Sequence, residues 1–173
     1  LLAKKDGDIL RATTVRDGKE NLLKVNTTAE IKGNKMVCKS KIEFYGINDN
    51  GYRGSFSQMN KQEIENFIES LVKRMSQSGK LISYKILPEE LLNSGENLII
   101  EMEYEAKEMV IGGKYKIINI PRFSRMIGVY NSAFQGAGLT SRKYPYKLRY
   151  TSAIDEEVKV KMDKNMKIES LPE

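Results

Sequence analysis

An alternating pattern between Leu23 and Phe44 places the strongest constraint on what this chain can fold into. Apolar or small side chains occupy every second position from Leu23 to Ile31 and again from Met36 to Phe44, and only Val37 interrupts the pattern. Period-two alternation on both sides of a Gly-Asn turn is typical of two antiparallel strands with one face toward water. The chain is therefore predicted to contain a β-hairpin, with Cys38 on its inward face.

One amphipathic helix is predicted after this hairpin, at about Lys61–Ser78. Asn60 is a good N-cap residue, and Glu63 takes the capping-box position three residues later. Gly79 suits the C-terminal end of a helix. The apolar residues that recur at helical spacing are Ile64, Phe67, Ile68, Leu71, Val72 and Met75. We expect this stripe to pack on a sheet.

The remaining pattern favours an α+β fold that is mainly β, with antiparallel sheets in a sandwich-like arrangement and the single helix packed on a sheet. The run Gly46–Gly54 is rich in Asn, Asp and Gly and is predicted to be a loop. Residues 1–22 are predicted to lead in from a preceding domain, and residues 23–173 to form one β-rich domain that is truncated at both ends. Further strands are predicted at Ile9–Val15, Lys80–Ile86, Leu98–Ala106, Lys114–Ile120, Lys147–Ser152, Glu156–Met162 and Met166–Ser170.

The residues that are absent exclude most catalytic chemistry. The chain has no histidine and one cysteine, so it cannot form a Ser-His-Asp or Cys-His arrangement or the usual zinc sites. It has no Gly-rich phosphate loop that ends in Gly-Lys-Ser or Gly-Lys-Thr. Cys38 lies in a strand pattern with no base to activate it. We expect no enzyme activity, no metal and no cofactor.

The overall charge favours a soluble protein without pointing to a ligand. The chain carries 29 Lys and Arg against 23 Asp and Glu, a net charge of +6. Both signs are expected to be mixed along the chain, as in a solvated surface. No apolar stretch approaches the ~18 residues of a membrane span, so membrane insertion is not predicted. The opening Leu1–Asp6 becomes charged at once and does not resemble a signal peptide.

One stretch supports a functional argument, because it interleaves cations with tyrosines. The candidate residues are Arg142, Lys143, Tyr144, Tyr146, Lys147, Arg149 and Tyr150. Such a stretch can form a sheet edge with solvated lysines, contact a protein or glycan, or bind single-stranded nucleic acid by stacking and phosphate contacts. Pro145 lacks an N–H group, so it is predicted to lie at the start of an edge strand or at a bulge, and the apolar side chains of that strand are predicted to face the core.

The order of these features resembles a known family. The early hairpin, the helix, the acidic alternating strand Leu98–Ala106, the Arg-x-x-Pro of Arg142 and Pro145, and the final Leu171-Pro172 follow one another as in that family. The chain is similar to the β-rich, uncharacterised region that follows the transglutaminase-like core in many bacterial secreted or periplasmic proteins. The resemblance implies an accessory role beside that core and a periplasmic or extracellular location. The family's catalytic residues lie in the core and have no counterparts in this chain.

Three hypotheses on function follow. The first is a non-catalytic accessory module whose partner is a neighbouring transglutaminase-like domain of the same polypeptide. The second is an independent β-module that binds a protein or a glycan. The third is nucleic-acid binding through residues 142–150, which would require steeply salt-dependent affinity.

Overall fold

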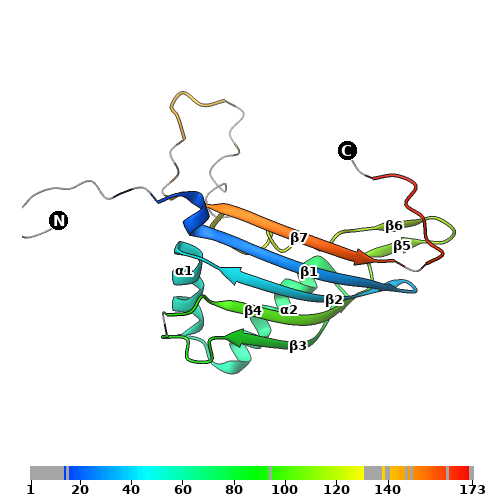
Figure 1. The fold of residues 1–173 in the computed structure, drawn as a ribbon, viewed down its shortest axis with the longest axis horizontal. Coiled ribbons are helices and arrows are strands. Elements are labelled where there is room, and N and C mark those ends of the chain that lie inside the picture. The colour runs from blue at the N-terminus through cyan, green and yellow to red at the C-terminus, as the bar shows by residue number, and fades with distance from the viewer. Residues whose placement is uncertain are drawn as a thin grey trace, which may run out of the picture.

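A computed structural model describes residues 14, 16–93, 95–130, 138, 141–146, 148, 150–162 and 164–171. This part of the chain is α+β and mainly β, with one five-stranded mixed sheet, a separate two-stranded hairpin and two α-helices (Figure 1). The elements are η1 (Gly18–Asn21), β1 (Leu22–Lys32), β2 (Lys35–Phe44), α1 (Ile47–Phe56), α2 (Lys61–Met75), β3 (Lys80–Leu87), β4 (Ile99–Ala106), β5 (Val110–Gly112), β6 (Lys116–Ile118) and β7 (Ala153–Lys161). The strand order of the large sheet is β3-β4-β2-β1-β7.

The predicted hairpin is confirmed as β1 and β2. The two strands pair antiparallel from Leu23 opposite Phe44 to Lys32 opposite Lys35. Side chains on one face are buried and those on the other are partly or fully exposed. Cys38 is fully buried on the inward face, as predicted.

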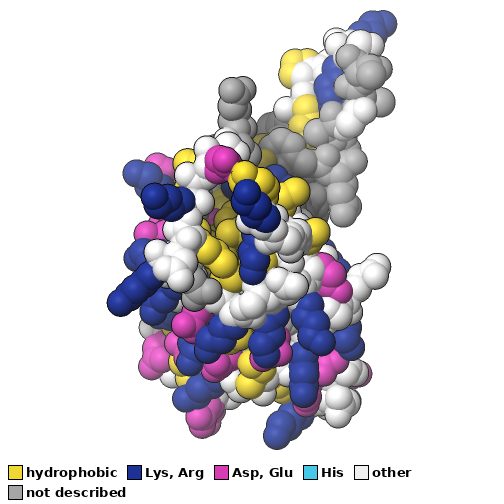
Figure 2. Space-filling view, turned by 90° about the vertical axis from the view of Figure 1, so that its right-hand side faces the viewer, with side chains coloured by type: hydrophobic (Ala, Val, Ile, Leu, Met, Phe, Trp, Pro, Cys, Tyr) yellow, Lys and Arg dark blue, Asp and Glu magenta, His cyan; other side chains and the backbone are white. Residues whose placement is uncertain are grey.

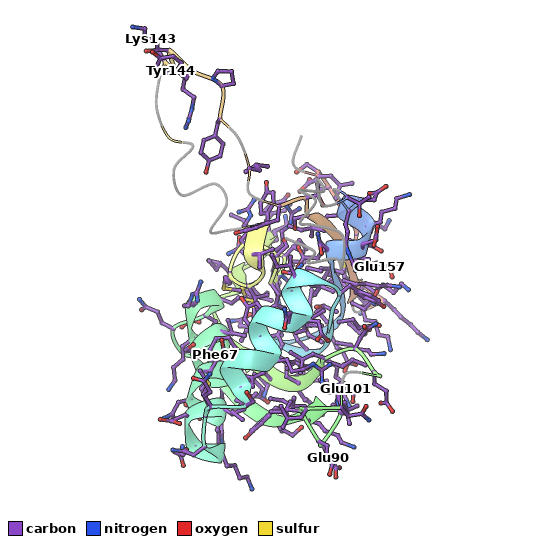
Figure 3. The ribbon with its side chains drawn as sticks, turned by 90° about the vertical axis from the view of Figure 1, so that its left-hand side faces the viewer. Phe67, Glu90, Glu101, Lys143, Tyr144 and Glu157 are labelled. Atoms are coloured by element: carbon purple, nitrogen blue, oxygen red, sulfur yellow. The ribbon has the colours of Figure 1, made fainter. Side chains whose placement is uncertain are left out.

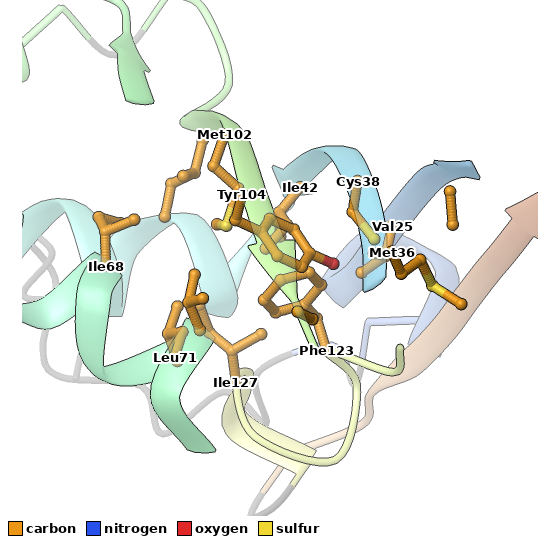
Figure 4. Close-up of a cluster of buried hydrophobic side chains, with 14 of the residues drawn as sticks. Val25, Met36, Cys38, Ile42, Ile68, Leu71, Met102, Tyr104, Phe123 and Ile127 are labelled. Atoms are coloured by element: carbon orange, nitrogen blue, oxygen red, sulfur yellow. The ribbon is translucent and has the colours of Figure 1, made fainter. Parts of the chain in front are cut away.

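The predicted helix is confirmed as α2, although it ends at Met75 rather than near Ser78. Asn60 and Glu63 form the capping box, in which each side chain accepts a hydrogen bond from the other residue's backbone N–H. Ile68, Leu71 and Val72 are buried, while Ile64, Phe67 and Met75 are half-buried. The stripe packs on the core as predicted (Figure 4).

The predicted loop at Gly46–Gly54 is wrong, because most of it is the helix α1. Gly46 has a φ of +57° and precedes the helix, where a Cβ would lie 2.2 Å from the carbonyl oxygen of Glu20. Inside the helix, the Arg53 guanidinium pairs with Asp49 one turn earlier, at 2.8 Å. Burial opposes ionisation of Asp49, but hydrogen bonds from Arg53 and the Leu98 N–H outweigh it and lower its pKa. Tertiary contacts thus override the weak helix propensity of this run.

The predicted sandwich-like arrangement is not seen in the described residues. Helix α2 lies on the apolar face of the large sheet, where a sandwich would place a second sheet, and α1 lies at one end of the sheet (Figure 1). The segment after β6 completes this cover, since Phe123 and Ile127 are buried and the Phe123 ring meets the Tyr104 ring edge-on at 5.8 Å. One layer of sheet therefore has a covered face and a wet face.

Not every pairing is antiparallel, because β7 lies parallel to β1 at the sheet edge. Parallel neighbours need a long crossover, and the residues between β4 and β7 provide it. β3, β4 and β7 lie near their predicted positions, and β6 is shorter than predicted. Residues 166–170, 148 and 150–152 form no strand, which corrects two predictions. The strand predicted at Ile9–Val15 lies outside the described residues, apart from Thr14.

Candidate binding surface

The chain's one thiol, Cys38, is buried in the core. Burial raises the pKa of Cys38 to about 11, and a hydrogen bond with Tyr104 offsets this only in part. In the part of the chain that the structure describes, no three Cys, Asp or Glu side chains are grouped so that they could hold a metal ion. None of the described helices is long and apolar enough to cross a membrane.

Alkylation of Cys38 tests its buried position. At about pH 8, we expect iodoacetamide to modify the native protein roughly 100-fold more slowly than the urea-unfolded protein, because the raised pKa leaves little thiolate. The rate follows from mass spectrometry of timed samples. Equal rates in the folded and unfolded states would show that the thiol is exposed.

The wet face of the large sheet is a weak candidate, because its charges neutralise one another. A shallow groove of about 470 Å³ crosses β1, β2, β4 and β3. Lys39 pairs with Glu103 across two strands at 3.2 Å, and Lys35 pairs with Glu105 at 2.7 Å. Exposed pairs of this kind stabilise little and leave no net charge for a ligand.

Charge is unevenly distributed in the second half of the chain. No Asp or Glu occurs between Glu108 and Asp155, so the segment 109–154 is free of acidic residues. It holds eight cations, which leaves 21 Lys and Arg against 23 Asp and Glu in the rest of the chain. The eight are Lys114, Lys116, Arg122, Arg125, Arg142, Lys143, Lys147 and Arg149. The expectation that both signs are mixed along the chain is wrong here, and the whole positive excess resides in this acid-free segment.

Exposed apolar side chains gather in the same acid-free segment. Of the 13 large hydrophobic residues that are exposed in the described part, eight belong to it. They are Ile111, Tyr115, Ile117, Ile120, Tyr130, Tyr144, Tyr146 and Leu148. Cations and exposed apolar groups together are the composition of a contact surface.

One group of these residues lies in the stretch 141–150, which we call the arm. Tyr144 is 73% exposed, and the Arg142 guanidinium lies 4.5 Å from the centre of the Tyr146 ring. The Lys143 ammonium lies 5.8 Å from the centre of the Tyr144 ring. Figure 3 shows Lys143 and Tyr144 on a loop that extends away from the sheet and helices. Lys147 and Arg149 lie outside the described residues.

The arm corrects the predicted edge strand. Residues 141–146, 148 and 150 form no strand, and Tyr144, Tyr146 and Leu148 are exposed where they were predicted to face the core. The edge strand beside β1 is β7, and the described residues of the arm do not pair with it. Pro145 also lacks the N–H that pairing would need.

Buried polar residues hold the chain at Val129, ahead of the arm, and at Thr151, directly after it. Asn48 is fully buried, and its side chain accepts a hydrogen bond from the Val129 N–H at 2.9 Å and donates one to the Asn21 carbonyl at 2.8 Å. The Asn21 side chain donates to the Thr151 carbonyl at 3.0 Å. Tyr150 donates its hydroxyl to the Val129 carbonyl at 3.4 Å. We call Asn21 and Asn48 the junction, because they connect the chain before the arm to the chain after it.

The residue types of the arm are predictable from the sequence, but the junction is not. Asn21 lies in the predicted lead-in and Asn48 in the predicted loop, and neither belongs to a periodic pattern. The sequence does contain one further signal of a contact surface, which is the absence of carboxylates from residue 109 to 154.

Comparison with known proteins does not extend these observations. No protein-family model, no curated protein and no solved structure matches this chain.

Proposed function

We propose that this chain is a non-catalytic accessory domain that binds the surface of a neighbouring protein domain through the arm. The observation that carries the proposal is the exposed Tyr144 beside Arg142 and Lys143, in the stretch between Val129 and Thr151, which are both hydrogen-bonded to the buried junction. Tyr and Arg are the residues that most often dominate the energy of protein interfaces. A loop with fixed ends loses less entropy on binding than a free one.

Charge favours a partner surface with carboxylates. The acid-free segment, to which the arm belongs, carries eight Lys and Arg and no Asp or Glu. Guanidinium and ammonium groups form their strongest hydrogen bonds with carboxylates or phosphates. An acidic patch with an apolar pocket for Tyr144 would satisfy the arm.

Nucleic acid is less well supported as the partner. Single-stranded binding uses the faces of aromatic rings to stack bases. Here the Arg142 guanidinium lies over the Tyr146 ring, and the Lys143 ammonium lies near the Tyr144 ring. Cations in these positions compete with bases for the rings.

The resemblance in sequence order favours a transglutaminase-like domain of the same polypeptide as the neighbour. It also favours a periplasmic or extracellular location. Under this proposal the chain shapes or supports the neighbouring domain, and the catalytic residues belong to that domain. Glycan binding is the alternative, since exposed tyrosines also contact sugars.

Site-specific photo-cross-linking tests the proposal. A benzophenone amino acid is placed at Tyr144 in the full polypeptide with its native flanking sequence, and at Glu90 as the control. Figure 3 places these two residues at opposite ends of the molecule, and both are exposed. On irradiation, we expect the benzophenone at position 144, but not the one at position 90, to form a cross-link to one acidic segment of a neighbouring domain. Mass spectrometry identifies that segment.

Two outcomes would contradict the proposal. The absence of a specific cross-linked product at position 144, or the same products at both positions, would show that the arm is not the contact.

A second assay measures retention on single-stranded DNA, which we expect to be weak. If retention is strong and is lost both at high salt and in the variant R142S/K143S/Y144S, nucleic-acid binding replaces the proposal. Stability of the variant should stay within about 0.5 kcal/mol of wild type, because these positions are at the surface.

A further inference from the structure

The second group of exposed apolar residues in the acid-free segment lies on the hairpin β5–β6. Val110 is buried opposite the half-buried Ile118, so one face of the hairpin packs on the core. Ile111 and Ile117 pair on the other face and are 52% and 68% exposed. Tyr115, in the turn, is 66% exposed. The hairpin therefore presents an outer face of two isoleucines and a tyrosine to water.

This outer face is held in place. The Lys116 ammonium donates a hydrogen bond to the Gly33 carbonyl in the β1–β2 turn, at 2.8 Å. The Asn119 N–H donates to the Met109 carbonyl at 2.8 Å, which closes the base of the hairpin. Gly112 has a φ of +119°, and a Cβ there would lie 2.2 Å from the Tyr115 carbonyl oxygen. The turn thus requires glycine, and the two isoleucines are exposed on an ordered strand pair.

Lysines surround the hairpin at this end of the sheet. Figure 2 views this end and shows a hydrophobic area among many Lys and Arg side chains. A hollow of about 510 Å³ is lined by Lys32, Asn34, Lys35, Lys107, Glu108 and Val110. Lys32 and Lys35 are paired with Glu30 and Glu105. Lys107 and Lys114 form no ion pair within 4.0 Å with any described residue.

The acidic residues near the hairpin do not cancel this excess. Glu30 and Glu105 each face one lysine. Hydrogen bonds from Ser76 and Ser78 hold the pKa of Glu108 at about 2, so this carboxylate is ionised but already has hydrogen-bond partners. From Met109 to Asn119 the hairpin has no carboxylate of its own. The outer face is thus apolar at its centre and cationic at its border.

We propose that the outer face of β5–β6 docks on an anionic lipid surface. Ile111 and Ile117 would enter the boundary between headgroups and acyl chains, Tyr115 would lie at headgroup level, and the lysines would contact lipid phosphates. A bilayer suits this face because binding to a bilayer requires no shaped pocket. The bilayer also supplies both apolar acyl chains and negatively charged headgroups. The docking is peripheral and involves no membrane span.

This inference is independent of the arm. The arm and the hairpin lie at opposite ends of the sheet (Figure 1), so a protein partner on the arm leaves the hairpin free. Failure of one proposal does not affect the other.

Vesicle flotation tests the inference. Unilamellar vesicles are made of phosphatidylcholine alone or with roughly one-third phosphatidylglycerol, which provides the negative surface charge. We expect wild-type protein to float with the anionic vesicles at low salt, with affinity at least about tenfold higher than for neutral vesicles. Binding should weaken as the salt concentration rises, because the lysine contribution is screened.

Two matched variants distinguish binding by the outer face from nonspecific hydrophobic binding. The variant I111S/I117S should lose at least about tenfold in affinity for anionic vesicles, because its apolar contribution is gone. The control variant I82S/L92S removes two exposed aliphatic side chains elsewhere and should bind like wild type. Circular dichroism and slow alkylation of Cys38 confirm that each variant is folded.

Several results would overturn the inference. These are equal wild-type binding to neutral and anionic vesicles, unchanged binding by I111S/I117S, and an equal loss in the control variant. A concentration-dependent dimer that is lost in I111S/I117S, without vesicle binding, would assign the face to a second copy of the chain instead.

Discussion

Replacing Arg53 by methionine is expected to lower the free energy of unfolding by about 3–5 kcal/mol. The Arg53 side chain is 10% exposed and forms a two-pronged ion pair with Asp49, with both contacts at 2.8 Å. It also donates to the carbonyls of Leu91, Asn93 and Glu96, at 2.7, 3.1 and 2.6 Å. Its removal leaves a half-buried carboxylate and three carbonyls without this partner. Urea denaturation measures the change.

The exposed pair in α2 provides a matched control. Lys73 and Glu69 have the same four-residue spacing and lie 3.0 Å apart, but the Lys73 side chain is 60% exposed. Lys73→Met should cost no more than about 0.5 kcal/mol, as is usual for surface pairs on helices. If the two methionine variants differ by less than about 1 kcal/mol, Arg53 does not hold the 91–96 loop as described.

Replacing Leu71 by alanine is expected to cost about 2–5 kcal/mol. Leu71 is fully buried where α2 packs on the sheet, and Figure 4 shows it in the core beside Ile68 and Ile127. The smaller side chain loses contacts and leaves a cavity that a sheet and a helix cannot close completely. The midpoint of urea unfolding should fall while the slope stays unchanged.

Phe67 offers the comparison within the same helix. Its ring contacts the Phe56 ring at a centroid distance of 5.3 Å, but the residue is only half-buried. Phe67→Ala should therefore cost less than the roughly 3–5 kcal/mol of a fully buried phenylalanine. A Leu71→Ala cost below about 1 kcal/mol would mean that the α2 stripe does not support the core.

The hairpin β1–β2 and the helix α2 were predictable because each leaves a local signal. In the hairpin, alternation places every second side chain on one face, and Gly33, with a φ of +66°, permits the turn. In α2, Asn60 and Glu63 satisfy each other's backbone N–H, and the apolar stripe has the period of a helix. These contacts join residues that are close in sequence, so the residue order carries the information.

Helix α1 and the parallel position of β7 were not predictable in this way. Arg53 is satisfied by carbonyls that lie 38 to 43 residues away, and this contact stabilises a helix in a sequence that locally favours a turn. The pairing of β7 with β1 joins residues about 130 positions apart. Which edge of the sheet β7 joins depends on the other segments that cover the apolar face of the sheet. A local sequence period carries no information about that choice.

The same division holds for the two candidate surfaces. The sequence alone determined their chemistry, because the tyrosines, isoleucines and cations of residues 109–154, and the absence of carboxylates there, can be read without a structure. Only the tertiary structure decided that the arm extends from the sheet and that Ile111 and Ile117 face water. Both outcomes depend on hydrogen bonds between distant residues, from Asn21 to Thr151 and from Lys116 to Gly33. Such bonds form only once the sheet has brought the partners together.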